Sequence, residues 1–161
     1  MTSDSDLNED FSDLLRELLN HDVQFLIVGA HAMAVHGVPR ATGDIDIFFA
    51  PTPSNVQSLM QALTAFGAPI ESHGVSEDSL LTLGTIYQLG LPPRRIDLIN
   101  RIDGVSFAEA WDTRIYTKVD QLKLPVIGID ALRKNKESTG REKDKLDIIL
   151  IEQLKSSNGD P

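Results

Sequence analysis

Two aspartates separated by a single residue, Asp44 and Asp46, are the side chains in this sequence best suited to chemistry. They alternate with the apolar residues Ile45 and Ile47, as is typical of a β-strand. Side chains on a strand point alternately to its two faces, so both carboxylates should emerge on one face. Like charges held side by side repel, and a divalent cation that prefers oxygen ligands would relieve the repulsion. The pattern suggests a metal site, and a solvated acidic edge strand is the plainer alternative.

A third aspartate, Asp97, lies within residues 95–99, where apolar and polar residues also alternate. Asp97 should therefore point to the face of its strand opposite its apolar neighbours. If this strand lies beside the first acidic strand, three carboxylates can converge. An ion pair with the adjacent Arg94 or Arg95 is the alternative.

The residues that precede the first two aspartates have a pattern suited to phosphate binding. Residues 25–28 are an apolar run expected to form a buried strand, Gly29 interrupts it, and residues 30–36 are expected to form a short helix. Backbone N–H groups at the start of such a helix can bind phosphate, and carboxylates on a nearby strand can hold the accompanying Mg²⁺. A simple turn at Gly29 is the alternative.

This arrangement resembles the nucleotidyltransferase fold of the DNA polymerase beta type. Within that fold it is most similar to small bacterial nucleotidyltransferases related to the AbiEii-type toxins of toxin–antitoxin systems. The matching positions are Gly29-Ala30, Arg40-Ala41-Thr42, Asp44-Ile45-Asp46 and, near the C-terminus, Lys136 and Asp147. One position departs from the pattern, because most catalytic members have serine or a second glycine where this chain has Ala30. Alanine keeps the backbone N–H donor but offers no hydroxyl to a phosphate.

The resemblance implies an α/β (α+β) fold in a single domain over residues 1–161, with a mixed central sheet flanked by helices and acidic strands at a nucleotide cleft. It implies an enzyme that uses Mg²⁺, or alternatively Mn²⁺, to move a nucleotidyl group from an NTP to a hydroxyl with release of pyrophosphate. The implied catalytic and metal-binding residues are Asp44, Asp46 and Asp97. The implied nucleotide-binding residues are Gly29, Ala30, Arg40, Thr42, Lys136 and Asp147.

The resemblance also implies partners. Besides the NTP, these are an acceptor (tRNA or another RNA, a protein or a small molecule) and a cognate antitoxin or toxin. Two rival functions stay open. One is a nucleotide-binding module on the same fold that has lost transfer activity, which Ala30 favours. The other is an antitoxin-like interaction protein whose acidic surface binds a basic chain. Both rivals predict that no pyrophosphate is released.

The rest of the chain contains signals for further helices and strands. Helices are expected over residues 6–20, 53–66, 76–83, 106–111 and 142–155 and from residue 130, and strands over residues 85–89, 95–99, 116–119 and 122–127. The apolar stretch of the last helix is too broad for one stripe, so this helix is expected to be well buried. Residues 1–5 and 156–161 are expected to be frayed.

Composition narrows the function further. The chain has 161 residues, 41% of them hydrophobic, and no cysteine, so disulfides and thiolate metal sites are excluded. The acidic first ten residues are unlike a targeting signal, and no apolar run approaches the ~20 residues of a membrane span. We therefore expect a cytoplasmic protein without membrane contact. A net charge of −9 makes it a poor general binder of nucleic acid, so an RNA substrate would need a local basic surface. The candidates are residues 94–95 and 133–145, with a charge-balanced helix face as the alternative for the second.

Overall fold

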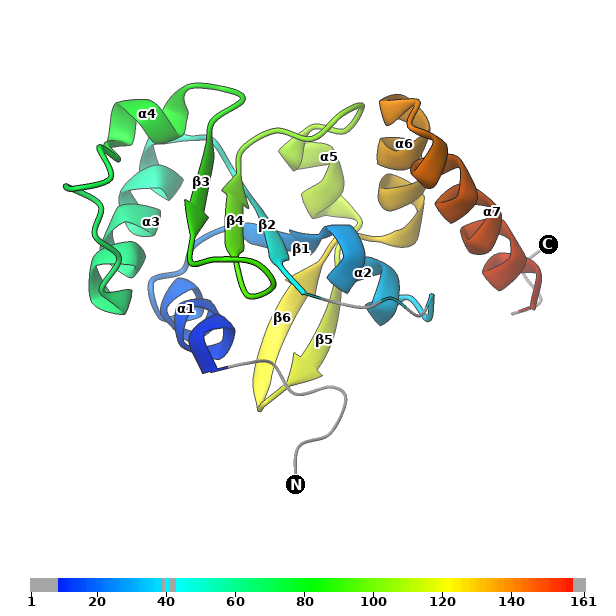
Figure 1. The fold of residues 1–161 in the computed structure, drawn as a ribbon, viewed down its shortest axis with the longest axis horizontal. Coiled ribbons are helices and arrows are strands. Elements are labelled where there is room, and N and C mark those ends of the chain that lie inside the picture. The colour runs from blue at the N-terminus through cyan, green and yellow to red at the C-terminus, as the bar shows by residue number, and fades with distance from the viewer. Residues whose placement is uncertain (1–8, 39, 41–42, 158–161) are drawn as a thin grey trace.

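The computed structural model describes residues 9–38, 40 and 43–157 and shows a mixed sheet of six strands flanked by helices (Figure 1). The strands are β1 (Phe25–Val28), β2 (Ile45–Phe49), β3 (Ile86–Leu89), β4 (Ile96–Ile99), β5 (Ile115–Val119) and β6 (Leu122–Val126). The helices are α1 (Glu9–Asn20), α2 (Gly29–Val35), α3 (Pro53–Phe66), α4 (Glu77–Leu81), α5 (Phe107–Asp112), α6 (Ile129–Thr139) and α7 (Glu142–Ser157). This is the mixed α/β fold class that the sequence predicts.

The strand order β3-β4-β2-β1-β6-β5 brings the two acidic strands together in the middle of the sheet. β2 pairs with β1 in antiparallel fashion and with β4 in parallel fashion. Parallel neighbours need a long crossover connection, and the segment through α3 and α4 provides it. At the other side, β6 runs parallel to β1 and pairs with β5 in an antiparallel hairpin.

Local signals in the sequence explain where several helices begin and end. Thr52 accepts a hydrogen bond from the backbone N–H of Asn55, Pro53 occupies the first turn, and Gly67 ends α3 in the left-handed conformation. Ser106 and Glu109 form a capping box at the start of α5.

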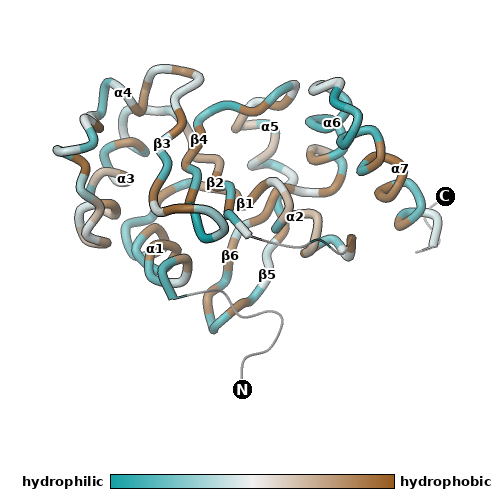
Figure 2. Tube along the Cα trace, in the orientation of Figure 1, coloured by the Kyte–Doolittle hydropathy of each residue, from teal (hydrophilic) through white to brown (hydrophobic). Residues whose placement is uncertain are grey.

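Part of the buried core lies where the sheet meets α1 and α3. The buried face of α1 contributes Phe11, Leu14, Leu15 and Leu18, at the helical spacing that the sequence predicts. Figure 1 shows α1 and α3 packed side by side, and Figure 2 shows hydrophobic residues along the central strands. In contrast, α6 is mostly hydrophilic (Figure 2). The sheet is therefore fixed firmly where the acidic strands cross its centre.

Helix α7 differs from the expectation of a well-buried helix, and that expectation was wrong. Leu146 and Ile149 are 56% and 53% exposed, whereas Asp144 and Asp147 are buried together with Ile151. The reason is that α7 packs against α6, at one end of the molecule, through a face that carries charged residues (Figure 1).

Across the described residues, no helix has both the length and the apolar character needed to cross a membrane.

Candidate active site

The pairing of β2 with β4 sets Asp46 directly beside Asp97. Residues paired across neighbouring strands point to the same face of a sheet, so these two carboxyl groups share one face. Asp44 lies just before β2, and its Oδ1 accepts a hydrogen bond of 2.8 Å from the backbone N–H of Arg95. The predicted adjacency of the two acidic strands is therefore confirmed.

We call Asp44, Asp46 and Asp97 the acidic cluster. Its electrostatics raise the pKa of Asp46 to about 6. Burial of the carboxyl group is the largest cause, followed by repulsion from Asp97, a hydrogen bond shared with Asp97, and repulsion from Asp44. The positive charge of Arg95 opposes these effects without cancelling them. Near neutral pH the cluster thus carries more negative charge than its surroundings neutralise.

Arg95 supplies the positive charge inside the cluster. Its Nε and Nη2 donate hydrogen bonds of 2.7 and 3.1 Å to the two carboxylate oxygens of Asp97, and Nη2 lies 3.5 Å from Oδ2 of Asp44. The sequence left two alternatives open for Asp97, convergence with the other acids or an ion pair with a neighbouring arginine. Asp97 lies beside Asp46 and also forms the ion pair with Arg95.

Gly29 allows the start of α2 to approach the acidic strand closely. Its φ of 70° lies in the left-handed region, and a Cβ at this position would collide with Oδ2 of Asp46. Val28 precedes α2, and its side chain makes no capping hydrogen bond to the first N–H groups of the helix, which include that of Ala30. A simple turn would require glycine at this position only for its backbone conformation. Here the close approach of the Asp46 side chain also excludes any Cβ.

A second charged cluster, which we call the α6–α7 network, contains residues that the resemblance assigned to nucleotide binding. Lys136 Nζ donates to Asp144 Oδ1 at 3.1 Å and to Asp147 Oδ2 at 2.7 Å. Arg40 forms an ion pair with Asp147, so the chain between α2 and β2 is tied to α7. Asp144 also accepts hydrogen bonds from Arg141 and Thr139.

This network alters the pKa values of its members. Burial lowers the pKa of Lys136, although its hydrogen bond to Asp144 acts in the opposite direction. For Asp144, burial would raise the pKa, but hydrogen bonds from Thr139, Arg141 and Lys136 outweigh it and hold the pKa at about 2. The side chain of Lys136 is only 11% exposed, so Lys136 is not a solvated surface lysine. Sequence analysis did not identify Thr139 and Arg141 as members of this network. The available signal was the pair Asp144 and Asp147, three residues apart on one helix face.

The predicted site residues therefore fall into separate groups. Asp44, Asp46 and Asp97 meet at the acidic strands with Gly29 and Ala30 close by, whereas the remaining predicted residues with described contacts belong to the α6–α7 network. Thr42 lies outside the described residues.

The acidic cluster fits a hard divalent cation by the chemistry of its donors, which are all carboxylate oxygens. Yet, within the described residues, no three His, Cys, Asp or Glu side chains are grouped closely enough to hold a metal ion. Three of the carboxylate oxygens are instead engaged by Arg95. Asp46 is the member of the cluster for which no ion pair with Arg95 is found.

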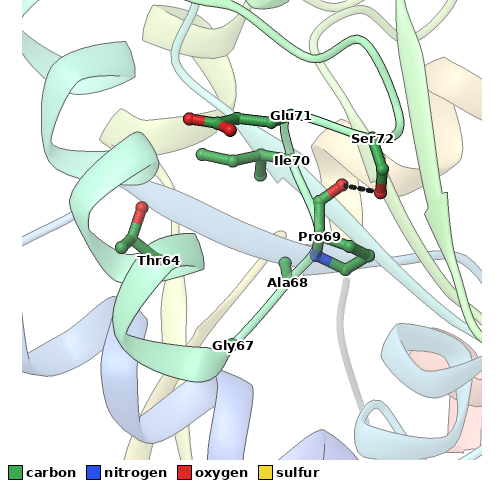
Figure 3. Close-up of a pocket in the computed structure, with 7 residues that line it drawn as sticks. All are labelled: Thr64, Gly67, Ala68, Pro69, Ile70, Glu71 and Ser72. Carbon is green, nitrogen blue, oxygen red and sulfur yellow. Dashed lines mark hydrogen bonds between the residues drawn. The ribbon is translucent and has the colours of Figure 1, made fainter.

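Among the surface pockets lined by described residues, two of the better defined lie elsewhere. Figure 3 shows a pocket of about 480 Å³ that follows α3 and is lined by Thr64, Gly67, Ala68, Pro69, Ile70, Glu71 and Ser72. A second pocket, of about 370 Å³, lies between α5 and the end of β2 and includes Gln24, Thr52 and Trp111. Neither contains a residue of the acidic cluster or of the α6–α7 network.

Comparison with known proteins identifies the fold. No protein-family model matches the chain, and a search of curated proteins finds no match. TM1012 from Thermotoga maritima, provisionally classed as a nucleotidyltransferase, superposes with a TM-score of 0.55 at 12% identity over 92% of this chain and 88% of its own. The lincosamide antibiotic adenylyltransferase LnuA, solved with lincomycin bound, superposes with a TM-score of 0.53 at 16% identity over 92% of this chain and 98% of its own. The chain has the nucleotidyltransferase fold, as predicted, and closeness to the AbiEii-type branch stays a prediction.

Proposed function

We propose that this protein is a Mg²⁺-dependent nucleotidyltransferase that moves a nucleotidyl group from an NTP to a hydroxyl and releases pyrophosphate. The observation that carries the proposal is the pairing of Asp46 with Asp97, directly against Gly29 at the start of α2. The fold shared with TM1012 and LnuA supports it independently.

Each group at the acidic cluster has a role in this reaction. Asp44, Asp46 and Asp97 would hold Mg²⁺ or Mn²⁺, which acts as a Lewis acid on the phosphates when bound. The N–H groups of Gly29 and Ala30 would orient the triphosphate. The acceptor oxygen attacks the α-phosphorus, its proton passes to a carboxylate of the cluster, and pyrophosphate leaves as the bond to the bridging oxygen breaks.

We propose that the α6–α7 network supports this site through Arg40, which Asp147 holds. We assign Arg40 and Thr42 to the phosphates, since both belong to the segment that leads into β2. Lys136 and Asp147 would position Arg40, because Lys136 is committed to two buried carboxylates and Asp147 holds the Arg40 guanidinium. In this proposal Lys136 acts through Arg40, in place of the direct contact with phosphate that the resemblance implies.

The acceptor that we favour is an RNA end, because the outer face of the β5–β6 hairpin is basic. Lys118 and Lys123 lie directly opposite each other, and Arg114 stacks on Trp111, with its guanidinium carbon 3.9 Å from the ring centroid. Like charges in this register destabilise a hairpin unless an anion binds them. Within the described residues, these three cations have no acidic partner.

The basic face lies on the same side of the sheet as the acidic cluster. Ile27 pairs with Ile47 and with Val126, and Val126 pairs with Ile115, so these residues mark one face. The alternate residues, which include Asp46, Asp97, Tyr116, Lys118 and Lys123, mark the other face. Three strand spacings separate β2 from β5, about 14–15 Å, so one nucleic-acid strand could contact both sites.

A small-molecule hydroxyl is the second candidate acceptor, and the likeness to LnuA favours it. Membership of a toxin–antitoxin pair is the most specific part of the proposal, and only the sequence resemblance supports it. A toxin should arrest bacterial growth on expression, and Asp44→Asn should abolish that arrest.

The decisive experiment incubates the protein with each labelled NTP, Mg²⁺ and total tRNA, a protein extract or a panel of small hydroxyl compounds. Pyrophosphate release together with labelling of one acceptor class is expected from the native protein and not from Asp44→Asn. Nucleotide binding without transfer to any acceptor would support the inactive module instead. Absence of both nucleotide and Mg²⁺ binding would support the interaction protein.

A further inference from the structure

We propose that the Arg95 guanidinium moves from the aspartates to the triphosphate, so that metal and nucleotide bind strongly only together. This inference rests on the proposed function, since it concerns how the same site is filled. It adds Arg95 as a binding residue that neither the sequence pattern nor the resemblance assigned to the nucleotide.

The backbone of Arg95 is fixed, whereas its side chain has room to move. The backbone N–H donates to Asp44, and the carbonyl accepts a hydrogen bond of 2.9 Å from Ile45, the first residue of β2. The side chain is 28% exposed, so the guanidinium can leave the cluster without disturbing the core. Any exchange is thus a rotation of one side chain about a fixed backbone position.

The guanidinium engages the oxygens that a cation would need. It takes both oxygens of Asp97 in a bidentate pair, and Nη2 also lies near Asp44. A cation that enters alone must break this charge-assisted pair and then repel the arginine that it displaces. This explains why the carboxyl groups are not arranged around a metal position while Arg95 contacts them.

A triphosphate changes that balance, because it gives the displaced guanidinium a new partner. Arginine presents a planar fork that matches phosphate oxygens as well as carboxylate oxygens. When metal and triphosphate bind together, the metal replaces Arg95 as the partner of the aspartates. The phosphate oxygens then replace the aspartates as the partners of Arg95. Each ligand should therefore raise the affinity of the other, by the same factor in both directions.

The test measures binding rather than turnover. Mn²⁺ affinity is determined by electron paramagnetic resonance, alone and with inorganic tripolyphosphate, a probe independent of the nucleotide base. Native protein should bind Mn²⁺ weakly alone and about 5–150-fold more tightly with tripolyphosphate, the usual range for coupled sites. In Arg95→Gln, Mn²⁺ alone should bind at least about tenfold more tightly than in native protein, and the coupling should shrink to a few-fold.

Two control variants sharpen the result. Arg94→Gln removes an exposed neighbour and should leave both affinities unchanged. Arg95→Lys keeps the charge but loses the fork, so its Mn²⁺ affinity should stay closer to native than that of Arg95→Gln. If Arg95→Gln does not fold, nitrogen-15 NMR of the native protein gives a second readout. The Arg95 Nε–H signal should shift when Mg²⁺, used here in place of Mn²⁺, is added together with tripolyphosphate.

The outcomes separate this inference from the proposed function. Equal or weaker Mn²⁺ binding by Arg95→Gln, or an Nε–H signal that stays fixed as ligands bind, overturns the exchange of Arg95. Transfer activity observed in the same native protein would leave the proposed function standing. Failure of Mn²⁺ to bind native protein and Arg95→Gln, with or without tripolyphosphate, contradicts both.

Discussion

The acidic cluster and the α6–α7 network contain the same type of side chain but shift its pKa in opposite directions. The pKa of Asp46 is raised to about 6, with burial as the largest cause. The pKa of Asp144 is held at about 2 although Asp144 is the more deeply buried of the two. Burial alone therefore does not determine the outcome.

The number of donors around each carboxylate explains the difference. Asp144 accepts hydrogen bonds from Lys136, Thr139 and Arg141, which satisfy its charge locally. Asp46 faces two other carboxylates, and Arg95 is hydrogen-bonded to those two neighbours. The network is balanced and structural in character, whereas the cluster retains a repulsion that a cation would relieve.

The comparison predicts, first, that removing a negative charge from the acidic cluster lowers the transfer activity but not the free energy of unfolding. Asp46→Asn should reduce nucleotidyl transfer about ten-thousandfold, about 5.5 kcal/mol in the barrier, because a metal ligand is lost. Its free energy of unfolding at pH 7.5 should equal or exceed that of native protein, because repulsion is removed. Transfer rates and urea denaturation measure the two effects. A variant that keeps native transfer rates would remove Asp46 from the catalytic set.

In the α6–α7 network, the opposite pattern is expected. Lys136→Met leaves two buried carboxylates without their shared cation and should lower the free energy of unfolding by about 3–5 kcal/mol. Lys145→Met, which removes an exposed ion pair with Glu142, should cost at most about 1 kcal/mol. Thermal and urea unfolding of the two variants give the comparison. If Lys136→Met were as stable as Lys145→Met but bound NTP weakly, the direct phosphate role would be restored.

Sequence alone could predict the acidic cluster because its information is local. Alternation fixed which way Asp46 and Asp97 point, and the apolar runs placed both on strands. The sequence could not decide whether Arg95 pairs with Asp97, since that depends on the side-chain conformation that Arg95 adopts beside Asp97 on the same segment. It also could not predict that Lys136 pairs with two aspartates of α7, or that one of them, Asp147, pairs in addition with Arg40 from the segment before β2.

Helix α7 shows the same limit from the other side. Its leucines and isoleucines suggested burial, but tertiary contacts with charged residues of α6 decided which face turns inward. Leu146 and Ile149 consequently lie outside. Hydrophobic pattern predicts burial only where the facing surface is itself apolar.

The contact between Gly29 and Asp46 is a third point at which the cluster can be tested. Gly29→Ala puts a side chain in the left-handed region and against Asp46 Oδ2, and should cost about 2–3 kcal/mol of stability. Gly140→Ala is the matched control, because Gly140 has a φ of 69° with open space around it and should cost about 1 kcal/mol. Urea denaturation gives both values, and adding Asp46→Ala to Gly29→Ala should recover most of the difference. Equal costs for the two glycine variants would show that Asp46 does not crowd Gly29.

The smallest expected effect is the pH dependence of stability, and it separates the two regions by sign. In the unfolded chain an aspartate has a pKa near 3.9. The raised pKa of Asp46 means that the folded state binds its proton more tightly, so the contribution to stability is greatest below about pH 4 and is lost as the pH rises to about 6. The lowered pKa of Asp144 has the opposite consequence, a contribution that is complete above about pH 4 and is lost as the pH falls towards 2.

Metal-free native protein should therefore lose about 1–2 kcal/mol of stability between pH 4.5 and pH 7 through Asp46, after allowance for solvent screening of a half-buried group. Asp46→Asn has no proton to release in this range, so its stability relative to native protein should rise by the same amount over the same interval. Urea denaturation of both proteins in chelator, at half-unit steps of pH, gives this difference directly and cancels the titration of other groups. A difference that stays constant from pH 4.5 to pH 7 would mean that Asp46 titrates normally. The repulsion attributed to the cluster, and with it the contrast with Asp144, would then be wrong.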